Sequence, residues 1–195
     1  MNARRGDAGF SLAELLVTMA FAPLLGALVF SFVQSSLRAA RLQQALSETQ
    51  DSAYLALSLL TRDLRQAGFT PDPVTLVPLS RAEPASVAIR ADFNGDGDCD
   101  DAAETISYRE DAARHTLTRA SGAAPPQPLA DNVEPGSLRF AYFSAAGARL
   151  DAGAGGLDLD SRRHVARVDL GFAVAVPGAP PVSVSASVEL RNARP

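Results

Sequence analysis

The chain has few of the residues that form disulfides or zinc centres. It contains one cysteine, Cys99, among 195 residues, so no disulfide can form within it. A core of this size can do without disulfides, and the cysteine content therefore does not identify the redox compartment. A zinc site is disfavoured, because Cys99 and the two distant histidines, His115 and His164, are a poor ligand set.

Clustered positive charge and catalytic motifs are also absent from the sequence. The 18 basic residues are scattered, the net charge is −4, and no strip of aromatic and basic residues occurs, so no nucleic-acid partner is indicated.

The sequence has no G-x-S-x-G elbow, P-loop, H-E-x-x-H or strand-to-helix G-x-G-x-x-G. We place His115 and His164 on strands and expect them to be surface or packing residues. The chain is therefore expected to be a structural or binding protein and not an enzyme.

What the chain does have is a long uncharged stretch near its N-terminus. No charged residue occurs among the 19 residues from Leu15 to Val33. As a helix this stretch spans about 28 Å, close to the hydrocarbon thickness of a bilayer. Arg4 and Arg5 precede it, so the positive-inside rule predicts a cytoplasmic N-terminus and a remainder outside the cytoplasm. We predict one membrane span.

The apolar pattern predicts one continuous helix from Phe10 to Ala67. No Gly or Pro interrupts the chain between Val33 and Gly68, and Pro71 and Pro73 follow, which is typical of a helix end. Apolar or small residues beyond Val33 recur at spacings of three, four and seven, which marks one helical face. This face comprises Leu42, Leu46, Ala53, Leu57, Leu60 and Leu64.

Beyond Pro73 the apolar period changes to two, which is typical of strands. The predicted strands are Ser86–Ala91, Thr105–Arg109, His115–Arg119, Ser137–Phe143, His164–Val176 and Val182–Arg191. Turn-rich segments at Ser121–Pro128 and Ala152–Gly156 separate some of them. A long helix followed by strands predicts an α+β fold, in which the amphipathic half of the helix packs its leucine face on an antiparallel sheet.

The N-terminal sequence Gly9-Phe10-Ser11-Leu12-Ala13-Glu14 resembles the processing site of type IV prepilins and type II secretion pseudopilins. The resemblance implies that a prepilin peptidase cuts after Gly9 and methylates the new amino terminus at Phe10. It also implies that Glu14 serves assembly by pairing with the amine of Phe10 on a neighbouring subunit. A carboxylate at the start of an uncharged span is costly in hydrocarbon, which agrees with a need for such a partner.

Two plainer interpretations of this segment stay open. Glu14 would be tolerated without a partner at the headgroup level of the membrane. Alternatively, the segment is a secretory signal peptide that ends near Ala39-Ala40, although its apolar run is longer than the usual 7–15 residues.

Two further stretches narrow the resemblance within the superfamily. The segments Leu57–Phe69, with the sequence LSLLTRDLRQAGF, and Val188–Asn192 resemble PilW-type minor pilins and the related J-class, PulJ-like pseudopilins. The early position of Pro23 and the lack of a C-terminal cysteine pair argue against a major pilin.

The resemblance implies a pilin-like fold and a structural role. Its parts would be a leader (1–9), a membrane half of the helix (10–33), an amphipathic half (34–68) and a β-rich domain (69–195). The protein would reside in the inner membrane and then join minor and major pilins in an extracellular pilus. The alternatives are a J-class pseudopilin of a type II secretion system and a membrane-anchored, calcium-dependent adhesin that never polymerises.

Residues 92–104 form an acidic loop with the spacing of a calcium site. Oxygen-bearing side chains alternate around Gly97, as in the first nine positions of an EF-hand loop, but position twelve is Ala103 and the acid follows one residue later. We expect an isolated Ca²⁺ loop between strands, not a switching EF-hand. The alternative is a metal-free turn of self-bonding Asp and Asn residues, although five aspartates within ten residues repel one another. The expected ligands are Asp92, Asn94, Asp96, Asp98, Asp100 and Glu104.

Overall fold

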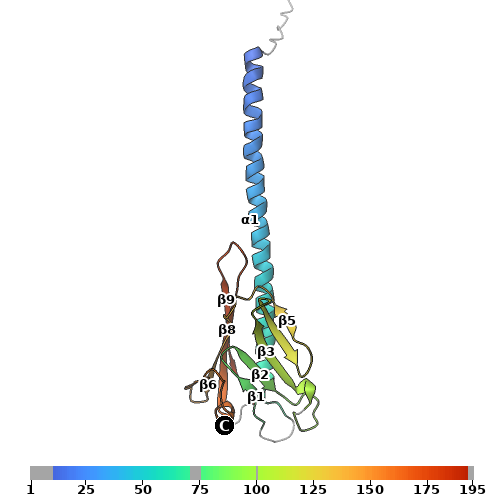
Figure 1. Ribbon diagram of the computed structural model, residues 1–195, viewed down its shortest axis with the longest axis vertical. Coiled ribbons are helices and arrows are strands. Elements are labelled where there is room, and N and C mark those ends of the chain that lie inside the picture. The colour runs from blue at the N-terminus through green and yellow to red at the C-terminus, as the bar shows by residue number, and fades with distance from the viewer. Residues whose placement is uncertain (1–10, 71–75, 100, 193–195) are drawn as a thin grey trace, which may run out of the picture. The chain divides into compact units, whose positions relative to one another are not determined.

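The computed structural model describes residues 11–70, 76–99 and 101–192 (Figure 1). The chain divides into two compact units between Gln44 and Ala45. One helix, α1 (Leu12–Gln66), begins in the first unit and ends in the second. The predicted single helix is therefore confirmed within the described residues, and α1 continues through Pro23.

The second unit adds two antiparallel sheets to the end of α1. The first sheet has the order β1-β2-β3-β4-β5 and the second the order β7-β6-β8-β9. The strands are β1 (Leu79–Ala82), β2 (Ser86–Arg90), β3 (Thr105–Asp111), β4 (Thr116–Ser121), β5 (Gln127–Ala130), β6 (Arg139–Ser144), β7 (Arg149–Leu150), β8 (Val165–Val174) and β9 (Val182–Glu189). Two short helices, η1 (Ala102–Glu104) and α2 (Leu159–Arg163), complete the described elements. The predicted α+β class is confirmed.

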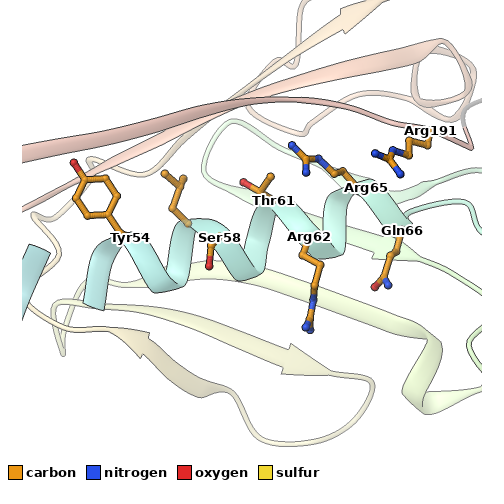
Figure 2. Close-up of a pocket in the computed structure, with 8 residues that line it drawn as sticks. Tyr54, Ser58, Thr61, Arg62, Arg65, Gln66 and Arg191 are labelled. Atoms are coloured by element: carbon orange, nitrogen blue, oxygen red, sulfur yellow. The ribbon is translucent and has the colours of Figure 1, made fainter. Parts of the chain in front are cut away.

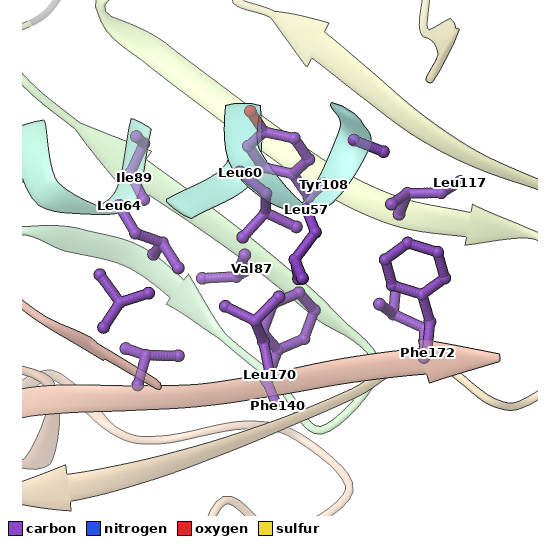
Figure 3. Close-up of a cluster of buried hydrophobic side chains, with 14 of the residues drawn as sticks. Leu57, Leu60, Leu64, Val87, Ile89, Tyr108, Leu117, Phe140, Leu170 and Phe172 are labelled. Carbon is purple, nitrogen blue, oxygen red and sulfur yellow. The ribbon is translucent and has the colours of Figure 1, made fainter. Parts of the chain in front are cut away.

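The core lies between α1 and both sheets. Leu57, Leu60 and Leu64 of α1 are buried, as their spacing predicted, and Leu170 and Phe172 of β8 face them across the core (Figure 3). Side chains of the first sheet that contribute include Val87, Ile89, Tyr108 and Leu117. The alternating burial of β3 and β9 fits sheets with one face on a core and one face in solvent.

The structure corrects several predictions about the strands. All six predicted strands exist with shifted ends, but β1, β5 and β7 were missed, and the sheet is divided into two. The predicted turn through Pro128 is wrong at its end, because β5 begins at Gln127. Pro128 is tolerated there because β5 is an edge strand and needs fewer ladder hydrogen bonds.

Both histidines lie outside the strands on which they were placed. His115 occupies the turn between β3 and β4 with a φ of 54°, and His164 is the C-cap residue of α2. Both side chains are exposed. The expected surface location is confirmed, although the secondary structure differs.

The end of α1 is fastened to the sheets through main-chain groups. Gly68 has a φ of 75°, and its N–H donates to the carbonyl of Arg90 over 2.7 Å. A Cβ at Gly68 would approach the Pro78 ring to 2.9 Å, so a larger residue would be strained and crowded. The Asn192 side chain donates to the Ala67 carbonyl at 3.2 Å. These contacts bring the start of the acidic loop next to the end of the helix.

Candidate functional site

The predicted processing junction, Gly9-Phe10, lies outside the described residues, whereas Ser11 and Glu14 lie within them. The Ser11 N–H donates to Oε2 of Glu14 over 3.0 Å, and the Glu14 N–H donates to Oγ of Ser11 over 3.3 Å. This reciprocal pair is a capping box, which the S-x-x-E spacing could have predicted. Glu14 therefore has a hydrogen-bonding role at the start of α1 besides any role between subunits.

The following part of α1 presents apolar side chains without protein cover. It contains an 18-residue window long and apolar enough to cross a membrane, and none of that window is buried within the protein. Phe21, Leu25 and Phe30, for example, expose 58%, 59% and 65% of their surface. An exposed apolar surface of this extent marks a membrane or protein contact.

Hydroxyl groups in the same part of α1 are satisfied within the helix. Thr18 donates to the Leu15 carbonyl at 2.9 Å, Ser31 to that of Leu28 at 2.9 Å, and Ser35 to that of Phe32 at 2.8 Å. Internal bonding of polar groups is what a hydrocarbon environment requires, because lipid tails offer no hydrogen-bond partners. These hydroxyls are thus compatible with a membrane span.

The acidic loop lies between β2 and β3, with η1 directly before β3. Asp92 is fully buried at its start, and its two carboxylate oxygens accept hydrogen bonds from the backbone N–H groups of Gly95 and Gly97, at 2.6 and 3.1 Å. Gly95 and Gly97 have φ values of 80° and 91°, which other residues adopt only with strain. The glycines thus allow the chain to fold around the Asp92 carboxylate.

Asn94 and Asp96 shape the exposed side of the loop. Oδ1 of Asn94 accepts from the Asp96 N–H at 2.8 Å, and its Nδ2 donates to Asp96 at 2.9 Å and to Asp101 at 2.8 Å. Oδ1 of Asp96 accepts from the Asp98 N–H at 3.1 Å. Asp101 was absent from the predicted ligand set, and the structure assigns it a contact with Asn94.

Glu104 lies at the end of the acidic loop, as the last residue of η1 directly before β3. Its side chain is 1% exposed, and neither carboxylate oxygen has a hydrogen-bond partner in the described part of the chain. One oxygen from each of Asp92, Asp96 and Glu104 lies within 4.8 Å of the other two. The structure therefore brings three of the predicted ligands together, and the one-residue offset of Glu104 from the EF-hand spacing does not keep it from the site.

The remaining predicted ligands are placed differently. Asn94 forms hydrogen bonds with its neighbours in the loop, Asp98 is exposed, and Asp100 lies outside the described residues.

The only cysteine of the sequence, Cys99, lies in the same loop. Burial, and then the negative charges of Glu104 and Asp92, raises the pKa of the Cys99 thiol to about 11. Cys99 is therefore a neutral, buried thiol near physiological pH, next to the carboxylate cluster.

A groove runs along the end of α1 in the second unit (Figure 2). It is lined by Tyr54, Leu57, Ser58, Thr61, Arg62, Arg65, Gln66 and Arg191. Figure 2 shows Arg65 and Arg191 on one side of the helix and Arg62 on the other. With Tyr54 exposed by 57% and Leu57 also in the lining, this groove combines apolar and basic side chains.

A buried polar network joins α1 to the first sheet. Tyr108 donates its hydroxyl to Oδ2 of Asp63 at 2.6 Å, and Nε of Arg119 donates to the same oxygen at 2.9 Å. Burial, and then the contact with Asp63, raises the pKa of Tyr108 above its usual range. Burial alone would lower the pKa of Arg119, but its bonds to Asp63 and Tyr108 outweigh this and raise it. The network therefore has a structural role, because it joins α1 to the first sheet through hydrogen bonds.

Similarity to known proteins is found among solved structures. No family model matches the chain, and no curated protein is significantly similar to it. Among solved structures it is similar to a type IV-like pilin from Thermus thermophilus, with 15% identity, a TM-score of 0.45, and coverage of 74% of this chain and 97% of that one. In the described residues, a long N-terminal helix is followed by antiparallel sheets, which is the α+β architecture that the sequence predicted.

Proposed function

We propose that this protein is a minor pilin-like subunit, made as a prepilin and built to enter a filament. The observation that carries the proposal is the joint occurrence of the Gly9-Phe10 junction, Glu14 and an uncovered apolar helix in one short segment. A prepilin peptidase would cut after Gly9 and methylate Phe10. The protein would stay in the inner membrane by the first half of α1, with its sheet domain in the periplasm, until it joins other pilins in an extracellular pilus.

The proposed subunit contact at Glu14 rests on charge rather than on hydrogen bonding alone. The capping box supplies a neutral N–H donor from Ser11, and no described residue gives the carboxylate a counter-ion at the edge of the apolar span. A protonated amine on Phe10 of a neighbouring subunit would supply that charge. The same pairing would also set the axial position of one helix against the next.

The basic, partly apolar groove at the end of α1 is proposed as a second assembly surface. Arg65 and Arg191 lie close together along its margin (Figure 2). Buried arginine contacts at protein interfaces are favourable when a carboxylate meets the guanidinium in a planar, bidentate arrangement. Acidic residues of a neighbouring pilin are therefore the expected partners.

Intact mass and N-terminal sequencing of the protein from native membranes test the processing step. The expected mature chain begins with N-methylated Phe10. A large residue in place of Gly9, as in Gly9→Leu, should leave the leader attached. Gly26→Ala is the matched control, because a Cβ there would meet no atom within 4 Å. A native chain that retains Met1–Gly9, or that begins near Arg41, would contradict the proposal.

Two variants, one at Glu14 and one at Ser11, separate charge from capping. Glu14→Gln keeps a side chain able to complete a capping box but removes the charge, whereas Ser11→Ala removes the capping hydroxyl and keeps the charge. We expect the Glu14→Gln protein to be cleaved and membrane-bound yet lost from sheared filaments, and the Ser11→Ala protein to be incorporated. Equal incorporation of both would leave Glu14 with a capping role only.

The same fractionation distinguishes the alternatives. A J-class pseudopilin would be processed in the same way but would co-purify with type II secretion subunits instead of pilus subunits. A non-polymerising adhesin would stay in the membrane fraction and be missing from sheared filaments in the unmodified strain.

A further inference from the structure

Glu104 is a buried acidic residue whose two carboxylate oxygens have no hydrogen-bond partner in the described part of the chain. A carboxylate that is 1% exposed and accepts no hydrogen bond from the described residues is far more costly than an ordinary surface acid. Asp92, also fully buried, and Asp96 bring their oxygens within 4.8 Å of it and add further negative charge. No ion pair joins any of the three to a basic side chain among the described residues.

We infer that Asp92, Asp96 and Glu104 bind one divalent cation of the calcium class, and that the bound ion fastens the acidic loop to the end of α1. The inference is independent of the filament proposal, because it concerns only the second unit and its own stability.

The cluster of three carboxylates suits calcium better than smaller ions, and the spacing of its oxygens is compatible with calcium. Calcium–oxygen distances of about 2.3–2.6 Å place ligands on opposite sides of the ion up to about 4.6–5.2 Å apart. The three carboxylates, within 4.8 Å of one another, fall inside that span. Magnesium demands near-ideal octahedral geometry at about 2.0–2.1 Å and usually keeps several waters, so a cluster of three carboxylates suits it less well. An all-oxygen ligand set also favours a hard cation over zinc or copper.

A metal-free turn accounts for only part of the geometry. Self-bonding explains the contacts of Asn94 and Asp96 with their neighbours, because such Asp and Asn turns form without metal. It does not explain Glu104, which lies directly before β3 and whose carboxylate accepts no hydrogen bond from the described part of the turn. The N–H groups of Gly95 and Gly97 hold the Asp92 carboxylate in place and leave each of its oxygens a second lone pair for an ion.

Backbone hydrogen bonds connect this site to the helix end. The Asp92 N–H donates to the Phe69 carbonyl at 2.8 Å, and the Ala91 N–H donates to the Glu104 carbonyl at 3.1 Å. An ion between the Asp92 and Glu104 side chains would therefore immobilise the segments that contact the end of α1. Phe69 and Phe93, exposed by 48% and 43%, line a hollow with Arg65 and Arg191 in the same region. Occupancy of the site would order this surface.

The test uses the full chain purified in detergent micelles and stripped of metal with a chelator. Calcium chloride is titrated by calorimetry, and thermal unfolding is followed with and without it. A Kd of about 10⁻⁴ to 10⁻³ M is expected, as for extracellular calcium modules. At about 100 times the Kd, calcium should raise the Tm by roughly 5–10 °C. Magnesium chloride at the same concentration should give a smaller shift.

Glu104→Gln is the decisive variant, because it keeps the shape of the side chain and removes its charge. It should lose at least about tenfold in calcium affinity. In chelator its Tm should equal or exceed that of the unmodified chain, because the repulsion among the three carboxylates is relieved. Asp151→Asn, at an exposed aspartate outside the loop, is the matched control and should keep the full response. Asp96→Asn, at an exposed ligand, provides a second variant if Glu104→Gln does not fold.

Hydrogen exchange locates the effect along the chain. Calcium should increase amide protection in residues 66–70 and 92–99 of the unmodified chain and should not do so in the Glu104→Gln protein. The inference is overturned if calcium leaves the Tm of the unmodified chain unchanged, or if Glu104→Gln responds to calcium as the unmodified chain does.

Discussion

The two halves of α1 contain similar leucines in opposite surroundings. Leu24, Leu25 and Leu28 are 57–59% exposed, whereas Leu57, Leu60 and Leu64 are 9%, 0% and 0% exposed. In the first half, apolar residues occur on all faces of the helix, which suits a lipid environment. In the second half they occupy one face, with polar residues between them, which suits packing on a protein core. The distribution of polar residues therefore separates the two environments, and leucine content does not.

The largest expected effect is on the buried half of this comparison. Leu60→Ala should lower the free energy of unfolding by about 2–5 kcal/mol, because it opens a cavity in the core shared by α1 and both sheets. Leu55→Ala, at a residue 70% exposed, should change it by less than about 0.5 kcal/mol. Denaturant unfolding of the full chain in micelles provides both values. Similar losses for both variants would mean that the assigned buried face is wrong.

The second prediction applies the same substitution to each half. Leu28→Arg places a charge within the apolar window and should cost about 2.5–3.5 kcal/mol of membrane insertion. Leu55→Arg should leave insertion unchanged. The fraction of protein that stays with membranes after alkaline carbonate extraction measures the effect. Retention of the Leu28→Arg protein at the unmodified level would contradict a membrane role for the first half.

The third prediction concerns the buried polar network of Asp63, Tyr108 and Arg119, which involves the second half of α1. Arg119→Leu leaves the buried Asp63 carboxylate with fewer partners and should cost about 1–3 kcal/mol of unfolding free energy. Arg114→Leu removes an ion pair to Asp111 whose arginine is 82% exposed, so a loss of at most about 1 kcal/mol is expected. Chemical unfolding at neutral pH compares the two variants.

The smallest effect at neutral pH comes from two buried tyrosines, whose ionisation makes stability depend on pH only in the alkaline range. Burial raises the pKa values of Tyr108 and Tyr142 above that of an unfolded tyrosine, about 10. The folded state then retains protons that the unfolded state loses, so stability is full below about pH 10 and falls as the pH rises beyond it. The expected slope is about 1.4 kcal/mol per pH unit for each tyrosine. Tyr142→Phe should remove one such contribution, whereas Tyr54→Phe, at a residue 57% exposed, should remove little.

Much of the fold could be predicted because its signals are local. The limits of α1 agree with its apolar run and with Gly68, and the six longer strands follow alternating patterns. The short strands β1, β5 and β7 gave no comparable signal, since each is an edge strand stabilised by a neighbour. Division into two sheets depends on pairings between distant segments, which periodicity does not specify.

The candidate metal site could likewise be predicted from the sequence only where its signals are local. Alternating oxygen-bearing residues indicated the loop at Asp92, Asn94 and Asp96, but burial of the Glu104 carboxylate without a partner became visible only in the structure. The network of Asp63, Tyr108 and Arg119 was missed for a related reason. Tyr108 and Arg119 are opposite each other in the β3–β4 register, and α1 supplies Asp63 from 45 residues away along the chain.

The sequence by itself determined the membrane-length apolar helix, the buried face of α1 and the spacing of the acidic loop. Each depends on residues within a few turns or strand positions of one another, where helix and strand geometry set which side chains are neighbours. Only the tertiary structure decided the division into two sheets, the hydrogen-bond network around Asp63 and the proximity of the Glu104 carboxylate to those of Asp92 and Asp96. Those contacts depend on strand pairing and on burial against a common core, and both are properties of the whole chain.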